Sequence, residues 1–200
     1  NSGVFLEVKD IEHNGNGDLS LEISELDTKT SAMVSFELDS TRYLDNTIVK
    51  LEALIGVDLK TNTYSFLKNE GFINKLPLVF EGFVRIFEEK QEVAIKFKTP
   101  SSEFANFLAV IPQVYAKNLE EVQTTGNFNI AGEIAGIIDD EYIPEFNIQI
   151  NARDASVKYP DLPKAIKNIN MDLSIKNTSG LAEDTYIDID KASFAIENDS

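Results

Sequence analysis

Apolar and polar residues alternate along most of this chain, which is the pattern of β-strands that bury one face. The alternation recurs in short runs from the start of the sequence to its end. The runs are Val4–Val8, Leu19–Ile23, Ala32–Leu38, Val49–Ile55, Val93–Phe97, Phe128–Ile138, Phe146–Ile150, Ile169–Ile175, Ile187–Ile189 and Phe194–Ile196. They predict about ten strands.

The segments between the runs carry residues that favour turns. The clearest are Asn14-Gly15-Asn16-Gly17, Lys60-Thr61-Asn62 and Asn177-Thr178-Ser179-Gly180. Consecutive strands joined by short turns pair in an antiparallel meander. A short likeness between Gly82–Ile86 and Gly126–Ile130 favours a sheet that is extended by repetition over a closed sandwich.

One segment departs from the period of two. After Ser101-Ser102-Glu103, apolar residues follow at spacings of three and four, at Phe104, Phe107, Leu108 and Ile111. This spacing predicts a short helix that is capped by Ser and ended by Pro112. For the stretch 163–168, a second turn of helix and an extended lead into the next strand both stay open.

The segment Leu76–Phe87 is apolar on both faces, so it is interpreted either as a central strand covered by the helix or as part of an apolar channel. The predicted fold class is therefore mostly β: an extended, antiparallel, repeat-like sheet or groove with one or two short helices. We expect residues 1–200 to form a single β-rich segment of a larger protein, with sub-units 1–75 and 76–200 as the alternative division.

The amino-acid composition limits the kinds of catalytic site, metal site and partner that can be expected. The 200 residues include no Cys and a single His, His13, so neither a thiolate nor a multi-imidazole metal site is expected. The net charge of −16 predicts no nucleic-acid partner and repulsion from anionic membrane surfaces. No run of about 18 apolar residues occurs in the sequence.

Polar clusters give no convincing active site, and we expect neither a catalytic residue, a metal nor a cofactor. The segment Glu12–Ser20 resembles a calcium loop, but Ile23 stands where a bidentate Glu is required, which favours a hairpin turn. Asp139, Asp140 and Glu141, and likewise Asp188 and Asp190, are interpreted as solvated acidic faces. No serine lies in a Gly-x-Ser-x-Gly elbow and no glycine-rich phosphate loop occurs, so the chain is predicted not to be an enzyme.

The predicted helix beside the segment 76–87 has two interpretations, an ordinary helix-on-sheet core and the lining of a lipid-binding groove. A single helix leaves most of a ten-stranded sheet without cover, and this surplus apolar surface is the physical argument for the groove. The predicted lining residues are Phe80, Val84, Ile86, Phe104, Leu108, Phe128, Ile130, Phe146 and Ile148.

A family resemblance comes from the second half of the chain. The segments are Phe107-Leu108-Ala109-Val110-Ile111-Pro112, Gly126-Asn127-Phe128-Asn129-Ile130-Ala131-Gly132, Ile143-Pro144-Glu145-Phe146, Tyr159-Pro160-Asp161-Leu162-Pro163 and Ile166-Lys167-Asn168-Ile169-Asn170. In this order, they resemble the AsmA-like proteins of Gram-negative bacteria, in particular the Bacteroidetes form. The resemblance is clearest over residues 76–200.

The resemblance implies a long periplasmic protein that is tethered to the inner membrane by a helix absent from this sequence. It further implies repeated β-grooves, phospholipid acyl chains or other envelope proteins as partners, and a role in outer-membrane biogenesis or lipid handling. Two alternatives stay open beside it: a structural scaffold or protein-interaction spacer, and an extracellular β-sandwich that binds carbohydrate or calcium.

Overall fold

Ten strands form one antiparallel sheet in the order of the chain. The structure is a computed structural model that describes residues 4–38, 41–100, 103–108 and 121–196. The strands are β1 (Val4–Gly17), β2 (Ile23–Leu38), β3 (Thr41–Asp58), β4 (Thr63–Ile73), β5 (Leu76–Ile86), β6 (Gln91–Lys98), β7 (Gln123–Ile138), β8 (Glu145–Lys158), β9 (Ile166–Asn177) and β10 (Tyr186–Ile196). The predicted mostly-β, antiparallel, extended sheet is confirmed.

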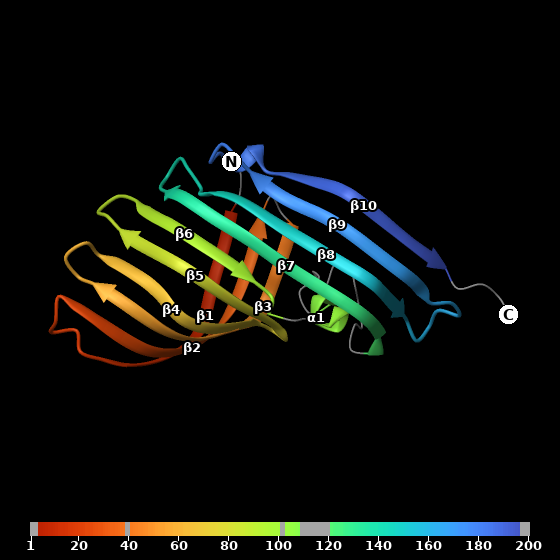
Figure 1. Cartoon of the computed structure of the whole chain (residues 1–200), viewed down its shortest axis with the longest axis horizontal. Helices are drawn as coiled ribbons and strands as arrows, with labels where there is room; N and C mark the ends of the chain where they lie inside the picture. The colour runs from red at the N-terminus through yellow and green to blue at the C-terminus, as the bar shows by residue number, and fades with distance from the viewer. Residues whose placement is uncertain (1–3, 39–40, 101–102, 109–120, 197–200) are drawn as a thin grey trace.

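The sheet is open and strongly twisted. At the left end of the sheet in Figure 1 the colours pass from red to blue in order, because each strand lies beside its neighbours in sequence. The upper parts of β1, β2 and β3 pass behind β5–β7 in that view. The upper parts of β1, β2 and β3 run at a steep angle to β7–β10 in that view, as the right-handed twist of successive strands requires. The described strands form a single sheet, so the β-sandwich alternative does not describe this fold.

Strand register separates two chemically different faces. Residues directly opposite each other in an antiparallel pair lie on the same face. One row of opposite residues crosses β7–β10 as Ile130, Ile150, Leu173 and Ile189. The neighbouring row on the other face runs across β8–β10 as Gln149, Ser174 and Asp188. We call the apolar face, which also carries the short helix α1 (Phe104–Leu108), the inner face, and the polar face the outer face.

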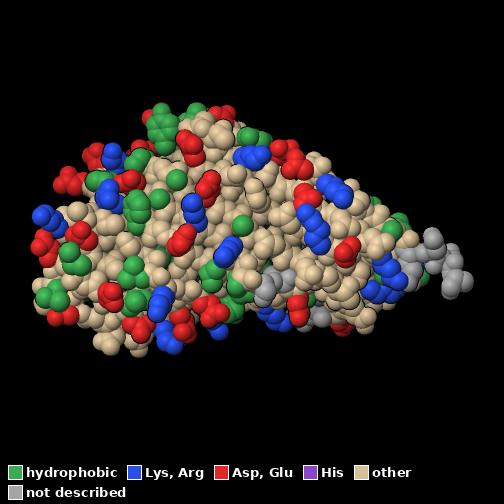
Figure 2. Space-filling view, in the orientation of Figure 1, with side chains coloured by type: hydrophobic (Ala, Val, Ile, Leu, Met, Phe, Trp, Pro, Cys, Tyr) green, Lys and Arg blue, Asp and Glu red, His purple; other side chains and the backbone are tan. Residues whose placement is uncertain are grey.

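Cross-strand ion pairs lie on the outer face. Their nitrogen-to-oxygen distances are 3.1 Å for Lys29–Glu52, 2.9 Å for Arg85–Glu92 and 3.4 Å for Lys176–Asp188, and Arg153 also pairs with Asp172. Exposed pairs of this kind contribute about 0–1 kcal/mol each. Figure 2 shows basic and acidic side chains interspersed over the surface turned to the viewer. They help to keep this face in solvent and fix strand register.

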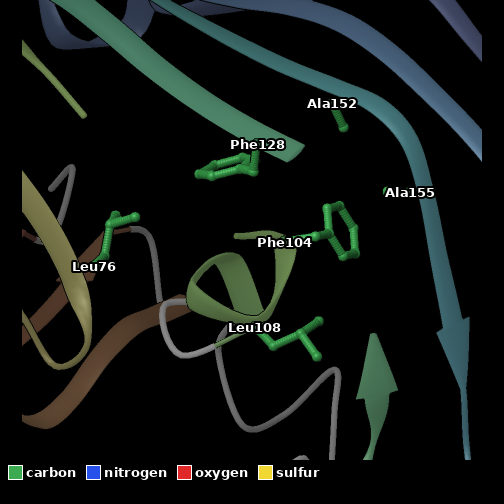
Figure 3. Packing of buried hydrophobic residues seen from close by; sticks show 6 residues of the cluster. All are labelled: Leu76, Phe104, Leu108, Phe128, Ala152 and Ala155. Carbon is green, nitrogen blue, oxygen red and sulfur yellow. The ribbon is translucent and has the colours of Figure 1, made fainter. Parts of the chain in front are cut away.

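A small buried core lies where α1 packs on the inner face of β7 and β8. Phe104 and Leu108 of α1 meet Phe128 of β7, with Leu76 at the start of β5 beside them (Figure 3). The rings of Phe104 and Phe128 are edge to face, with centroids 6.5 Å apart. Ala152 and Ala155 of β8 complete the cluster, and their small side chains allow the helix to approach the sheet closely.

The helix prediction holds at its start, because α1 begins at Phe104. The predicted cap residues Ser101 and Ser102, and the predicted end at Ile111 and Pro112, lie outside the described residues. For 163–168, the extended lead is the correct alternative, since β9 begins at Ile166. The second helical piece is instead a 3-10 turn, η2 (Ala182–Asp184).

One turn prediction is wrong. Residues Asn14–Gly17 continue β1, and the chain reverses at residues 18–22, where Asp18 Oδ1 accepts a hydrogen bond from Ser20 N at 2.9 Å. Consequently Leu19 and Leu21 lie in the turn, and Ile23 begins β2. The turns predicted at Lys60–Asn62 and Asn177–Gly180 are confirmed between β3 and β4 and between β9 and β10.

Candidate functional site

The inner face is the feature of this chain that is best suited to binding. Across the register from β5 to β8, the paired inner positions of the described strands carry apolar residues, glycine or uncharged polar residues. The apolar members include Phe80, Val84, Val93, Ile95, Phe97, Ile130, Ile134, Phe146, Ile148 and Ile150. A surface of this composition has no charged group that would need water, so hydrocarbon can cover it without leaving a charge unpaired.

Much of this face is only half-buried. On β7 and β8, complete burial is found beneath and around α1, at Phe128, Ala152 and Ala155. Ala53 and Val57 of β3 are also buried, outside that cluster. Ile148 and Leu173, outside this cluster, and Ile150, which packs against it, retain intermediate exposure. Part of the apolar surface of the inner face is therefore still accessible to water. Burying that surface against hydrocarbon would contribute about 25 cal/mol per Å².

The residues predicted to line a groove all come from this side of the molecule, but they divide into two groups. Phe104, Leu108 and Phe128 are 4%, 9% and 2% exposed, so they belong to the packed contact between α1 and the sheet. They are the ordinary core that the alternative interpretation described. The others lie on the inner face and are half-buried or, at Ile86, exposed: Phe80, Val84, Ile86, Ile130, Phe146 and Ile148. Of these, Ile130 packs against the edge of the buried cluster.

Aromatic rings on the inner face lie over glycines of the neighbouring strand. A Cβ atom at Gly132 would lie 2.7 Å from the ring of Phe97, which is opposite it in β6. Phe66 of β4 is opposite Gly82 of β5 and packs edge to face on Phe80, with ring centroids 4.9 Å apart. Neither Phe66 nor Phe97 was among the predicted lining residues, although the glycines opposite them were a signal of close approach.

The strand at the C-terminal edge extends the apolar surface into solvent. Ile187, Ile189 and Phe194 of β10 are 64%, 61% and 67% exposed. Ile187 and Ile189 are opposite Ile175 and Leu173 of β9, so they continue the inner face. The buried core and the exposed edge thus belong to one continuous apolar sheet face.

The acidic clusters behave as turn and surface residues. Asp139 Oδ1 accepts hydrogen bonds from the backbone N–H groups of Glu141 at 2.9 Å and Tyr142 at 2.8 Å. These bonds lower the pKa of the Asp139 carboxyl below its usual value. Asp188 pairs with Lys176. Within the described ranges, no group of His, Asp and Glu side chains is arranged to hold a metal ion.

A shallow hollow at one end of the sheet is the remaining candidate. Lys60, Asn62, Arg85 and Phe87 line it, together with neighbouring turn residues. Arg85 is already engaged, because its guanidinium pairs with Glu92 and its Nε donates to Thr63 Oγ1 at 3.0 Å. The guanidinium of Arg85 is therefore not available to an anion in this hollow.

Comparison with protein-family models, with curated proteins and with solved structures finds no match to this chain. None of the helices in the described part of the chain is long and apolar enough to cross a membrane. The chemistry of the inner face is consequently the observation on which a functional proposal has to rest.

Proposed function

We propose that this chain is a non-enzymatic segment that handles lipid by presenting its inner face to acyl chains. The supporting observation is the uncharged, half-buried inner face of β5–β8, continued by exposed isoleucines on β10. Burial of each CH₂ group against such a surface contributes about 0.8 kcal/mol. A lipid held in this way would be bound by its tails, and the outer face would stay in water.

The biological setting follows from the resemblance to AsmA-like proteins. In that setting the chain is one stretch of a long periplasmic protein that is tethered to the inner membrane and serves outer-membrane biogenesis. The acidic outer surface suits this proposal, because a net charge of −16 disfavours adsorption of the whole segment to anionic headgroups. Other envelope proteins would then contact the outer face.

A scaffold function is the second candidate, and one observation favours it. The core around Phe104, Leu108 and Phe128 shows that the chain covers part of the inner face with its own side chains. If more of the face were covered in the same way, the sheet would act as a spacer between partners and would not bind lipid.

Native mass spectrometry after incubation with a diacyl phosphatidylethanolamine tests the proposed function. The wild-type chain should carry phospholipid adducts that survive purification. Ile148→Asp places a charge on the inner face of β8, and we expect it to abolish the adducts, since an unpaired carboxylate against hydrocarbon is costly.

Gln149→Asp is the matched control, because residue 149 is the next one along β8, is exposed and lies on the outer face. It should keep the adducts. A folded wild-type chain that never acquires lipid would contradict the proposal and leave the scaffold function. Equal loss in both variants would show that charge alone, and not the inner face, governs the adducts.

A further inference from the structure

In the part of the chain that the structure describes, both edges of the sheet are open. Among the described strands, β1 pairs only with β2 and β10 pairs only with β9. Each edge strand also exposes apolar side chains, such as Leu6 at 62% and Ile11 at 62% in β1, and Ile187 and Ile189 in β10. An open edge of this kind presents unpaired backbone groups to any strand of matching pattern.

We infer that the β10 edge of one copy of this chain pairs antiparallel with the β1 edge of a second copy, joining the sheets head to tail. This inference goes beyond the proposed function and requires no lipid. The register that we assign continues the pattern of each strand. It places Asp188 opposite Lys9, Ile189 opposite Val8, Lys191 opposite Glu7, Ala192 opposite Leu6 and Ser193 opposite Phe5.

Strand direction and face allow this pairing. Directions alternate across the ten strands, so β1 of a second sheet in the same orientation runs antiparallel to β10. Ile189 and Ala192 lie on the inner face, opposite Leu173 and Met171 of β9. Leu6 and Val8 lie on the inner face of β1, opposite Phe36 and Val34 of β2. The joined sheets would therefore share one continuous apolar inner face.

The phase of the backbone hydrogen bonds provides an independent check. Bonded pairs alternate with non-bonded pairs along an antiparallel ladder, so one bond fixes where the backbone groups of every residue in that ladder point. Thr99 N donates to Ile130 O at 2.8 Å between the β6 and β7 ladders, and Leu59 N donates to Glu22 O at 2.9 Å between β2 and β3.

Followed along the registers to the two edges, this alternation directs the N–H and C=O groups of Ile189 and Ala192 away from β9. It likewise directs those of Leu6 and Val8 away from β2. The assigned register brings these outward groups opposite each other. If the alternation on either edge strand were shifted by one residue, these groups would point into their own sheet and the assigned pairing could not form.

Charge complementarity selects this register over its neighbours. On the outer face, Lys191 is opposite Asp172 of β9, which Arg153 already holds, so Glu7 of a second copy would continue an alternating row of charges. A slip of two residues in one direction sets Lys191 against Lys9. A slip in the other direction sets Asp188 against Glu7. Like charges directly opposite each other are destabilising, so both slipped registers are disfavoured.

Sedimentation velocity of the 200-residue chain over a wide concentration range tests this assembly. A head-to-tail dimer keeps one free β1 edge and one free β10 edge, so the mass should rise with concentration past a dimer. Glu7→Lys and Lys191→Glu each set like charges opposite each other and should weaken association about tenfold. Mixing these two variants, or combining both changes in one chain, restores opposite charges and should restore assembly.

The matched controls are Glu22→Lys and Lys75→Glu, which make the same changes in net charge in turn residues and should assemble as the wild type does. Circular dichroism checks that each variant is folded. A wild-type chain that stays monomeric overturns the inference. So does a closed dimer that responds to Lys191→Glu and not to Glu7→Lys, since that pattern requires β10 to pair with β10. Failure of the mixed variants to recover assembly also overturns it.

Discussion

At one position in this sheet, two neighbouring backbones approach so closely that only glycine fits. Gly82 in β5 has a φ of 128°, and a Cβ atom there would lie 1.8 Å from the carbonyl oxygen of Ala94 in β6. Only glycine adopts this conformation without strain, and no side chain has room. The position is therefore fixed by the approach of two backbones, in the middle of the face that we propose to bind lipid.

Gly82→Ala should accordingly lower the free energy of unfolding by at least about 2 kcal/mol, because the strand has to shift or leave its ladder. Urea denaturation measures the change. Gly56→Ala is the control: its Cβ would meet only the side chain of Leu67, at 3.5 Å, which is ordinary contact. Equal losses in the two variants would show that the backbone approach at Gly82 does not limit stability.

Aspartates in the turns add a dependence on pH. Because hydrogen bonds from Glu141 N and Tyr142 N lower the pKa of Asp139, its ionised form stabilises the folded turn. That stabilisation is complete above the pKa of an unfolded aspartate, about 3.9, and is lost as pH falls through the lower folded pKa. The same kind of turn occurs at Asp18 and Asp58, whose pKa values are lowered by Ser20 and Thr61.

Asp139→Asn keeps an oxygen that accepts these bonds and does not titrate. We expect this variant to lose less stability than the wild type between pH 7 and pH 3, as measured by urea midpoints at the two pH values. Asp161→Asn removes the same charge from another exposed turn and is the control for net charge. An unchanged acid response in Asp139→Asn would contradict this role of the turn.

At the scale of the elements, α1 and its site on β7 and β8 form the strongest local contact. Phe128→Ala removes a side chain that is 2% exposed and should cost about 3–5 kcal/mol. Phe104→Ala should interact with it, because the rings are edge to face, and a double-mutant cycle should give a coupling of about 0.5–1.5 kcal/mol. Additive losses in urea denaturation would place α1 away from Phe128. Phe87→Ala, at an exposed ring outside the strands, is the control.

The elements also show how far the sequence predicts this fold. Alternation identified most of the strands and their apolar side, because a period of two follows directly from strand geometry. It missed β4, where a register shift between Phe66 and Gly71 interrupts the period, and it divided β10 into two runs for the same reason. The prediction of the first hairpin turn is wrong because the Asn-Gly residues at 14–17 favour a turn when only neighbouring residues are considered. In the structure, pairing with β2 keeps these residues in β1. Gly17 is needed there for close approach, since a Cβ would lie 2.3 Å from the side chain of Leu26.

The candidate site was predictable as a face and not as a set of exposed residues. Phe80 and Ile148 were placed correctly on the inner face by their alternation. The burial of Phe128 depends on where α1 docks, and that contact joins residues far apart in the sequence. Periodicity contains no information on such a contact, so helix-covered and open parts of the face look alike in the sequence.

For the whole molecule, stability should be graded across the sheet. Strands contact their neighbours in sequence, so the architecture is close to one-dimensional, as in repeat proteins. β7 and β8 have partners on both sides and are covered by α1, whereas every residue of β10 is exposed. Opening β10 requires only the loss of its pairing with β9, so its free energy of opening should be far below that of the central strands.

Hydrogen exchange followed by mass spectrometry should therefore show the fastest amide exchange in peptides from β10 and β1 and the slowest in β7 and β8. Uniform protection across the sheet would contradict a graded fold.

Raising the protein concentration should affect amide exchange only at the edge strands, because head-to-tail pairing gives the outward amides of β1 and β10 new hydrogen-bond partners. If the sheets join, exchange at these two strands should slow as concentration rises, while exchange at β7 and β8, which already have both neighbours, should stay unchanged.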